Sequence, residues 1–494
     1  ERGEEMLAIP IFLPLISGFV LFLLATAGHK WQDGITKKLS VAVMGIVLLT
    51  AVFHGINLYG KSPAVTIWKL KEDIPIVLNL DDLGTVFSTL VVFMWLLVTL
   101  YTFSYMKGDK KGARFLGCHL MTFGMLMGIT SAGNLVTMYL FYEGMTLATI
   151  GYVIHAQTKE AIAAGYKYVF YSIAGAFLGL IGFFYIYQLT PSIAFTPGGN
   201  FTHAAVAGHE ITLQLAVLGM IIGFGSKAGM FPLHGWLSTA HPVAPAPASA
   251  ILSGVNTKMG VIAILRVVYY IAGADFLRKS FVQYIVIGLA LLTIFMGSML
   301  AYQEKIMKRR LAYSTVSQVS YILFGIMLMR PAGFVGAMLH VIYHSVIKNN
   351  LFLCAGAVIH ETGTTRVEGY RGIGKRMPVT MVCFTLASLA LVGIPPFSGF
   401  VSKWKLGTTA LFSEIRVAKI AGPVVLLVSA LLTAGYLLTV SVHAFYDKPE
   451  KEERIKEDWK MVIPMVILAA LALLLGIFNE PLIHSLEDIV KGII

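Results

Sequence analysis

Long apolar segments recur along the whole chain and are separated by short polar ones. A segment of about 20 apolar residues is long enough to cross a bilayer as a helix. By this criterion the pattern predicts about 14 spans, and no stretch between them is long or polar enough for a separate soluble domain. The chain is therefore predicted to be an all-α, polytopic membrane protein. The spans lie near 6–27, 39–59, 83–106, 113–131, 134–155, 161–188, 211–239, 247–270, 281–301, 311–329, 332–359, 379–410, 421–446 and 459–478.

Two of these spans are interrupted by a proline motif. The seventh contains Pro232 and the twelfth contains Pro395 and Pro396, each followed three residues later by glycine and an aromatic residue. Proline removes a backbone donor and clashes with the preceding turn, so both helices are predicted to be broken. Breaks at matching places predict two internal repeats with a site between them. The alternative is that proline and glycine are simply common in membrane helices.

The repeats would comprise spans 4–8 and 9–13. This gives four predicted units, which are an N-terminal three-helix segment, a first repeat, a second repeat and a C-terminal helix with a tail. Their bounds are 1–112, 113–270, 281–446 and 447–494.

Composition agrees with a membrane protein. Hydrophobic residues make up 57% of the 494 residues and charged residues 13%, against about 25% charged in soluble proteins. The net charge of +12 does not indicate nucleic-acid binding, because the basic residues lie in short loops, as expected beside an anionic membrane surface. Cys118, Cys354 and Cys383 are far apart, and an iron–sulfur cluster needs about four thiolates. We expect no bound cofactor and no metal.

The distribution of basic residues predicts the orientation. Loops after odd-numbered spans carry more Lys and Arg than the other side, and the segment 189–210 carries none. By the positive-inside rule that segment and both termini lie outside, and the basic loops near 305–310 and 366–376 face the cytoplasm. The first apolar segment follows Glu4 and Glu5 and lacks a cleavage motif, so it is expected to be a retained span and not a signal peptide.

Several charged residues fall inside the spans. A Lys or Glu at a helix centre costs roughly 2.5–3.5 kcal/mol, so each is by default a functional candidate. Glu143 lies in the fifth span, Lys227 lies just before the Pro232 break, Lys258 lies mid-way along the eighth span, and Lys403 follows the second break. The alternatives are a Glu that holds helices together, and lysines that extend to the membrane surface.

The eleventh span carries three polar residues at spacings of four. His340, His344 and Lys348 therefore share one helical face, about 6 Å apart at each step. A metal or bis-His haem site is the rival interpretation, but no third ligand motif is apparent. A proton relay suits the row better, because imidazole titrates near neutral pH. Lys167 and His234 are further relay candidates; Lys167 could be interfacial, and His234 could cap the broken backbone.

These segments resemble a known family. FPLHGWLSTAH, APAPASAILSG and TKMG lie between Lys227 and Arg266, and LAYSTVSQ, LFLCAG and GIPPFSGFVSK follow. Together they resemble the antiporter-like membrane subunits of respiratory complex I (NADH-quinone oxidoreductase), of Mrp-type sodium/proton antiporters and of membrane-bound hydrogenases. The resemblance covers roughly 80–445, and the pattern looks most like the D-type antiporter subunit. One departure is Ile306, where many members have Asp.

The resemblance implies 14 helices, two inverted five-helix repeats, and broken helices 7 and 12. It also implies a location in the cytoplasmic (inner) membrane of a prokaryotic cell. No extension long enough for the lateral helix of the longest members follows residue 478. The residues that match the family's translocation residues are Glu143, Lys227, Lys258, His340, His344, Lys348 and Lys403.

The expected function is proton, or sodium/proton, translocation by a subunit of a multisubunit complex. Expected partners are homologous antiporter-like subunits, small membrane subunits and soluble iron–sulfur redox subunits, with no nucleic acid. The chain itself is expected to carry no redox centre. Whether its complex is an ion-translocating oxidoreductase or a non-redox antiporter stays open, as does a purely scaffolding role. The hypothesis for the mechanism is that Glu143 pairs directly with Lys227, and that opening this pair sends a proton toward Lys258, the eleventh span and Lys403.

Overall fold

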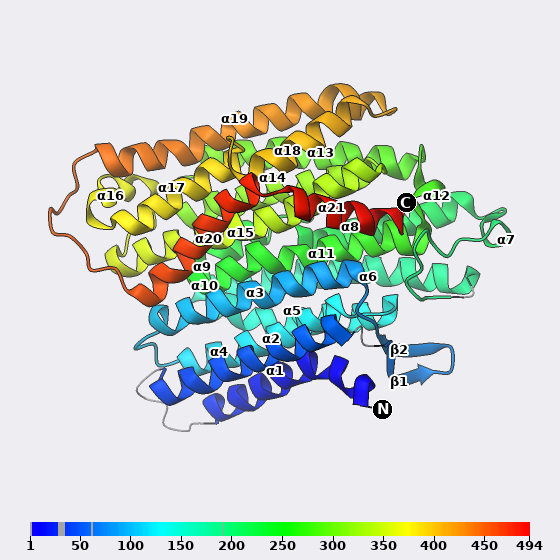
Figure 1. The fold of residues 1–494 in the computed structure, drawn as a ribbon, viewed down its shortest axis with the longest axis horizontal. Coiled ribbons are helices and arrows are strands. Elements are labelled where there is room, and N and C mark those ends of the chain that lie inside the picture. Colours follow the sequence, from blue (N-terminus) through cyan, green and yellow to red (C-terminus); the bar gives the residue numbers. More distant parts are fainter. Residues whose placement is uncertain (1, 28–34, 61–62, 191) are drawn as a thin grey trace.

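The computed structural model describes residues 2–27, 35–60, 63–190 and 192–494. Nearly all of them are helical, and the long helices pack side by side along one axis (Figure 1). The N-terminal part comprises α1 (Arg2–Thr26), α2 (Lys37–Gly60), β1 (Val65–Lys71), β2 (Ile74–Leu78) and α3 (Asp82–Tyr105).

The middle of the chain forms the first group of helices around a break. Its elements are α4 (Gly112–Thr130), α5 (Leu135–Val153), α6 (Lys159–Leu189), α7 (His203–Val206), α8 (Glu210–Ala228), α9 (Leu237–Val243), α10 (Ala246–Ile251), the π-helical η1 (Leu252–Asn256), α11 (Thr257–Leu265), the π-helical η2 (Arg266–Ala272) and α12 (Ala274–Leu277).

The second group has the same kind of order and ends the chain with two further helices. Its elements are α13 (Phe281–Gln303), α14 (Met307–Met327), α15 (Pro331–Thr362), the 3-10 helix η3 (Val367–Tyr370), α16 (Ile373–Arg376), α17 (Pro378–Val392), α18 (Ser398–Leu411), α19 (Arg416–Tyr446), α20 (Trp459–Ile477) and α21 (Glu480–Lys491).

The helices agree with the predicted spans. Within the described residues, 10 helices are long and apolar enough to cross a membrane, counting the continuous stretch from α10 to η2 as one. The other four predicted spans coincide with α4, α5, α14 and the pair α17–α18. The all-α, polytopic prediction is thus confirmed. Both ends of the chain lie at the same end of the bundle (Figure 1), as an even number of spans requires.

A β-hairpin departs from the purely helical prediction. β1 and β2 pair antiparallel between α2 and α3. Gly133 N donates to Val77 O at 2.8 Å and Asn79 N donates to Ser131 O at 2.7 Å, so β2 docks on the loop between α4 and α5. The hydropathy pattern does not reveal these strands, because they have only 7 and 5 residues and form no apolar segment of membrane length.

Both predicted helix breaks are present. Gly229 caps the end of α8 and Gly393 caps the end of α17, and both glycines have positive φ (79° and 91°), a conformation that favours glycine. Each break leaves helix-end carbonyl groups that need donors. Trp236 Nε1 donates to Ser226 O at 2.8 Å in the first break, and Lys403 Nζ donates to Leu391 O at 2.5 Å in the second.

The last span is followed by a further helix, which was not predicted. The end of α20 packs against the second break, where a Cβ on Gly476 would overlap Pro396 O. The chain then continues as α21, which packs on α15, and Lys405 Nζ of α18 lies 3.1 Å from Glu487 Oε1. The segment predicted to be a tail is therefore a helix. α21 is amphipathic and has only 12 residues, so no long apolar segment marks it.

The close contact at Gly476 gives a test of this packing. We expect Gly476→Ala to lower the thermal unfolding temperature of the purified protein, because overpacking against backbone costs about 1–3 kcal/mol. Gly407→Ala in α18 is the matched control, since nothing lies within 4 Å of a Cβ at that position. An unchanged unfolding temperature for Gly476→Ala would show that α20 does not abut the break.

Candidate functional site

Lys227 lies in the last turn of α8 and is buried, with 2% of its surface exposed. Its Nζ donates to Tyr168 Oη at 2.7 Å and to Ser172 Oγ at 2.8 Å, both on α6. The ammonium also lies 4.3 Å from the centre of the Tyr168 ring. Tyr168 Oη in turn bonds to Thr149 of α5. The lysine is thus held by polar groups next to the first break.

Glu143 lies on α5, partly buried, and does not pair directly with Lys227. Its Oε1 is buried and has no hydrogen-bond partner among the described residues. Two of the three donors of the Lys227 ammonium are already used by Tyr168 and Ser172. The two charges interact electrostatically across a gap wider than an ion pair. The hypothesis of a direct Glu143–Lys227 pair is therefore wrong for this structure.

Lys167 and His234 lie together at the first break. The Lys167 side chain packs near Gly235, and the His234 ring stacks on Phe231 with 5.8 Å between ring centres. His234 Nδ1 is buried without a hydrogen-bond partner in the described part of the chain. The Ser226 carbonyl freed by the break accepts its bond from Trp236 and not from His234.

Lys258 joins the two groups of helices. It is fully buried in α11, directly after the π-helical η1. Its Nζ donates to Ser253 O at 2.8 Å and bonds to His344 Nδ1 of α15 at 2.6 Å. π-helical turns occur frequently at functional sites, because they re-aim side chains. An ammonium only donates, so His344 Nδ1 is the acceptor of this bond.

The imidazole row continues from His344 to the second break. The rings of His340 and His344 stack with 5.9 Å between their centres, as their spacing predicted. His340 Nδ1 bonds to Ser402 Oγ at 2.9 Å. The next residue, Lys403, turns its Nζ back onto Leu391 O and Val392 O at the end of α17. The row thus ends at the second break.

Lys348 shares the row on α15 but reaches sideways to α14. Its Nζ donates to Leu311 O at 2.9 Å and to Ser314 Oγ. Thr315 Oγ1 also donates to Leu311 O, at 3.0 Å, and bonds to Ser253 Oγ at 2.6 Å. The polar contacts between Lys348 and Lys258 thus run through the Leu311 carbonyl, the hydroxyls of Thr315 and Ser253, and the Ser253 carbonyl.

Between Lys227 and Lys258 the described residues provide no hydrogen bond. α11 packs tightly on α8 there, since a Cβ on Gly260 would lie 2.6 Å from Ala228 N and 2.7 Å from Phe224 O. The first break and the central row are thus two polar clusters separated by a close helix contact.

Unpaired polar groups line the central row. Both amide atoms of Asn256 and of Gln318 are buried and without partners among the described residues, as are Nε2 of His340 and Nε2 of His344. Buried polar groups in proteins nearly always pair with protein or ordered water. This row is therefore suited to hold water. The unpartnered Nε2 atoms of His340 and His344 would be free to bind a metal ion, but the described residues contain no group of three or more His, Cys, Asp or Glu that could hold one.

Sequence reasoning missed two buried basic groups near the other end of α9. His241 is fully buried and stacks on Phe352 at 4.8 Å. Lys308 was assigned to a cytoplasmic loop, but it is buried at the start of α14 and donates to Ala244 O. A histidine or lysine at the end of a span gives only a weak signal, because such residues usually lie at the membrane surface.

A third missed feature is the ion pair of Arg266 with Asp81. The two guanidinium nitrogens lie 2.5 and 2.6 Å from the two carboxylate oxygens. The guanidinium lies 4.7 Å from the Phe195 ring centre and 4.5 Å from that of Tyr270. An Arg inside an apolar span could have been singled out by the same reasoning as the lysines.

Comparisons with known proteins agree with the resemblance. The family model described as "NADH:quinone oxidoreductase/Mrp antiporter, TM" matches residues 132–414. The model described as "NADH-Ubiquinone oxidoreductase (complex I), chain 5 N-terminus" matches residues 70–116.

Three relatives with different names illustrate the range of this family. The N-type NADH-quinone oxidoreductase subunit of Desulforudis audaxviator is 32% identical over 83% of this chain and 83% of its own length. The D-type Na(+)/H(+) antiporter subunit of Alkalihalophilus pseudofirmus is 29% identical over 98% of this chain and 96% of its own length. Hydrogenase-4 component B of Escherichia coli is 30% identical over 93% of this chain and 71% of its own length.

Solved structures share the fold. A chain of the membrane-bound sulfane sulfur reductase, an archaeal respiratory membrane complex, superposes with a TM-score of 0.85 at 24% identity and covers 99% of this chain and 97% of its own. A chain of the Mrp complex from Dietzia sp. DQ12-45-1b gives the same TM-score at 22% identity, with the same coverage. This chain therefore belongs to the family of antiporter-like membrane subunits shared by NADH:quinone oxidoreductase and Mrp antiporters.

Proposed function

We propose that this chain is a proton-translocating subunit of a multisubunit membrane complex, and that its path runs through the Lys227 cluster, Lys258, the α15 row and Lys403. The proposal includes a prokaryotic cytoplasmic membrane with both termini outside. Other membrane subunits are its partners, as the homologous complexes indicate. No cofactor of this chain is needed for such a path.

The contact between Lys258 and His344 is the main observation that supports the proposal. The two nitrogens are 2.6 Å apart in a fully buried site. Two positive charges at that distance would repel by about 6 kcal/mol at an effective dielectric constant of 20. The pair therefore holds one shared proton rather than two charges. When Lys258 passes its proton to His344 Nδ1, its amine becomes free to take up another proton, and His344 releases a proton from Nε2 toward His340, Ser402 and Lys403.

The gap between Lys227 and Lys258 is the natural point of control. The close contact of α8 and α11 separates the two clusters here, so a proton crosses only when water or a side-chain movement bridges them. A carboxylate at Glu143 favours the charged form of Lys227, because opposite charges attract. A change of charge at Glu143 thereby alters how readily Lys227 gives up its proton. Moving one charge against about 100 mV takes about 2.3 kcal/mol, which an electrostatic change of this kind can supply.

Glu143→Gln tests the proposal. The complex is purified, reconstituted in liposomes, and followed with an internal pH-sensitive dye. We expect the initial rate of proton transport to fall about tenfold, because the amide keeps the shape but removes the charge that acts on Lys227. Glu160→Gln, at an exposed carboxylate of α6, is the matched control and leaves the rate unchanged. An unaltered rate in Glu143→Gln would reject the role of Glu143.

The identity of the other subunits in the complex would distinguish redox-driven pumping from antiport. Soluble iron–sulfur subunits that co-purify with this chain would establish an oxidoreductase. Small membrane subunits alone would establish an antiporter. Replacing internal Na⁺ by K⁺ in the same liposomes separates proton transport from sodium/proton exchange.

A further inference from the structure

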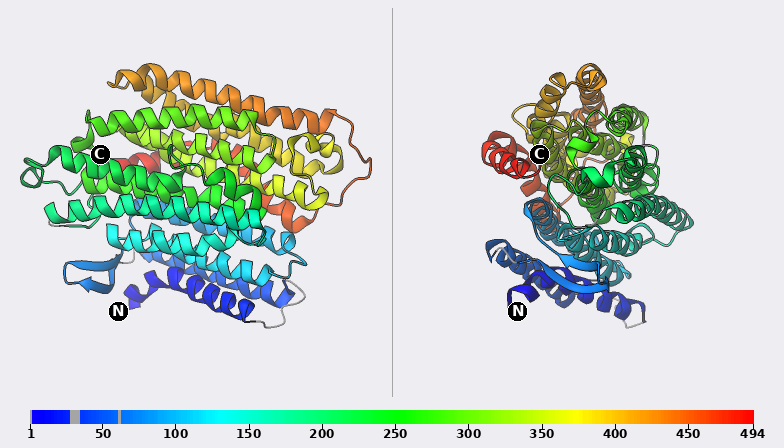
Figure 2. Two further views of the ribbon diagram at one scale, coloured as in Figure 1. Left: turned by 180° about the vertical axis from the view of Figure 1, so that it is seen from behind. Right: turned by 90° about the vertical axis from the view of Figure 1, so that its right-hand side faces the viewer.

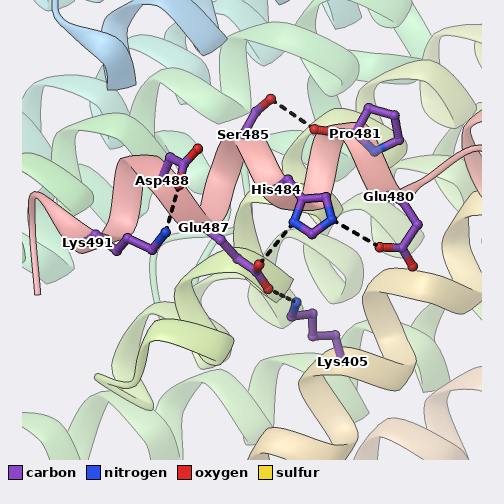
Figure 3. A network of polar contacts seen from close by, with 8 residues as sticks. All are labelled: Lys405, Glu480, Pro481, His484, Ser485, Glu487, Asp488 and Lys491. Atoms are coloured by element: carbon purple, nitrogen blue, oxygen red, sulfur yellow. Dashed lines mark hydrogen bonds and ion pairs between the residues drawn. The ribbon is translucent and has the colours of Figure 1, made fainter.

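The last helix, α21, has an apolar face and a charged face, and Figure 3 shows the charged side chains. Leu486 and Val490 are buried against the bundle. The charged side chains on the opposite face are exposed. The charged face of α21 comprises Glu480, His484, Glu487, Asp488 and Lys491.

This face lies at the depth of the apolar outer surface. α20 ends at the break of the twelfth span, and α21 then packs on α15, while Lys405 of α18 contacts Glu487. α18 exposes Trp404 and Leu411, and neighbouring α19 exposes Leu427 and Leu431, as expected of helices that face lipid. Seen along the bundle, the red C-terminal helices stand on its outer side (Figure 2).

Charges at such a depth do not face lipid without a large cost. An Asp, Glu or Lys exposed to the bilayer interior is strongly disfavoured, because hydrocarbon cannot replace its hydration. Glu480 begins α21, at the end nearest the break, and 76% of its side chain is exposed; for His484 the value is 72%. Both residues lie in the first half of α21, on the side of the break, whereas Lys491 ends the helix. Something polar must cover this face.

The ion pairs within the charged face of α21 leave one carboxylate without a lysine partner. Glu487 contacts Lys405 at 3.1 Å, and Asp488 contacts Lys491 at 2.8 Å. His484 lies between the remaining carboxylate of Glu480, at 3.8 Å, and Glu487, at 3.6 Å (Figure 3). Two lysines thus offset two of the three carboxylates. The face has one negative charge without a lysine, and a complementary surface would bring a basic side chain.

We propose that the charged face of α21 is the docking surface for a transmembrane helix of another subunit of the same complex, which places a Lys or Arg against Glu480 and hydrogen-bonding groups against His484. The proposal rests on the chain being a membrane subunit of a complex, but not on the route of the protons. A water-filled groove, lipid, and a second copy of this chain are the other occupants, and each gives a different result in the test below.

A photo-crosslinker at the face identifies the occupant. His484 is replaced by p-benzoylphenylalanine in the full complex, in its own membranes, and Leu427 on α19 is the matched lipid-facing control. We expect illumination to join position 484, and not position 427, to one other subunit, through a membrane helix that carries Lys or Arg. A cross-link to a second copy of this chain, a lipid adduct, or no protein product at position 484 would overturn the proposal.

Charge reversal tests the predicted complementarity. Glu480→Lys is expected to lower the amount of the cross-linked subunit that co-purifies with this chain by at least about tenfold, because a like charge replaces a buried pair. Glu450→Lys, in the exposed loop before α20, is the control and leaves the amount unchanged. If Glu480→Lys does not accumulate, Glu480→Gln replaces it, with a smaller loss. Full retention of the partner in both Glu480 variants would contradict the proposal, whatever their transport rates.

Discussion

Lys258→Met is expected to lower proton transport by the reconstituted complex by about 100-fold or more. Lys258 is the direct hydrogen-bonded link between α11 and His344, so its removal interrupts the row where the two groups of helices meet. Methionine keeps a similar length and fills the buried space without a charge, and the complex is therefore expected to assemble. The measurement is the initial rate of internal pH change in liposomes, normalised to the amount of assembled complex.

Lys258→Arg separates charge from proton transfer. Arginine keeps the positive charge but does not release its proton under these conditions. If Lys258 acts by exchanging a proton with His344, the arginine variant is as inactive as Lys258→Met. If the site needs only a fixed positive charge, the arginine variant transports at close to the normal rate, and the relay we propose is wrong. Lys419→Met, at an exposed position of α19, is the control for effects of losing a lysine.

The second large effect is on stability. Asp81→Asn is expected to lower the free energy of unfolding by about 3–5 kcal/mol, because it leaves the buried Arg266 guanidinium without its counter-charge. Asparagine is as good an N-cap as aspartate, so the bond that Asp81 Oδ1 accepts from Gly84 N at 2.8 Å is expected to survive. The change therefore isolates the ion pair that connects the start of α3 with the eighth span.

Denaturation of the purified protein in mixed micelles measures this loss. Asp82→Asn is the control, since the neighbouring carboxylate forms no ion pair in the described structure. Equal stability of the Asp81 and Asp82 variants would mean that the Arg266 pair contributes no net stabilisation, as happens when desolvation of the charges offsets their attraction.

The features predicted correctly from the sequence are those in which a residue differs sharply from the apolar residues around it in the same segment. Proline inside an apolar segment predicted both helix breaks, and isolated charges among apolar residues predicted buried polar side chains. The spacing of four on α15 was enough to place His340 above His344. In each case the signal lies within one segment, and the physical consequence does not depend on which helix is its neighbour.

What required the tertiary structure was the choice of partners. Lys227 bonds to Tyr168 and Ser172, which are ordinary residues of the sixth span, and not to Glu143. Lys348 turns toward α14, although its spacing alone would align it with His344. α21 was not predicted for a related reason. Its apolar residues repeat at helical spacing on one side only, so its hydropathy does not rise to that of a complete span.

Because of the π-helical turn before Lys258, the number of residues in this stretch determines the direction in which the Lys258 side chain points. A π-helical turn amounts to one residue inserted into an α-helix, and each residue of an α-helix turns the chain by about 100°. Removing one residue from η1, without changing any side chain of the row, would therefore swing Lys258 about a quarter of a turn away from His344. Relatives that differ by a single insertion or deletion in this stretch should carry their buried base at a different position along the eighth span, or should use another helix to supply it.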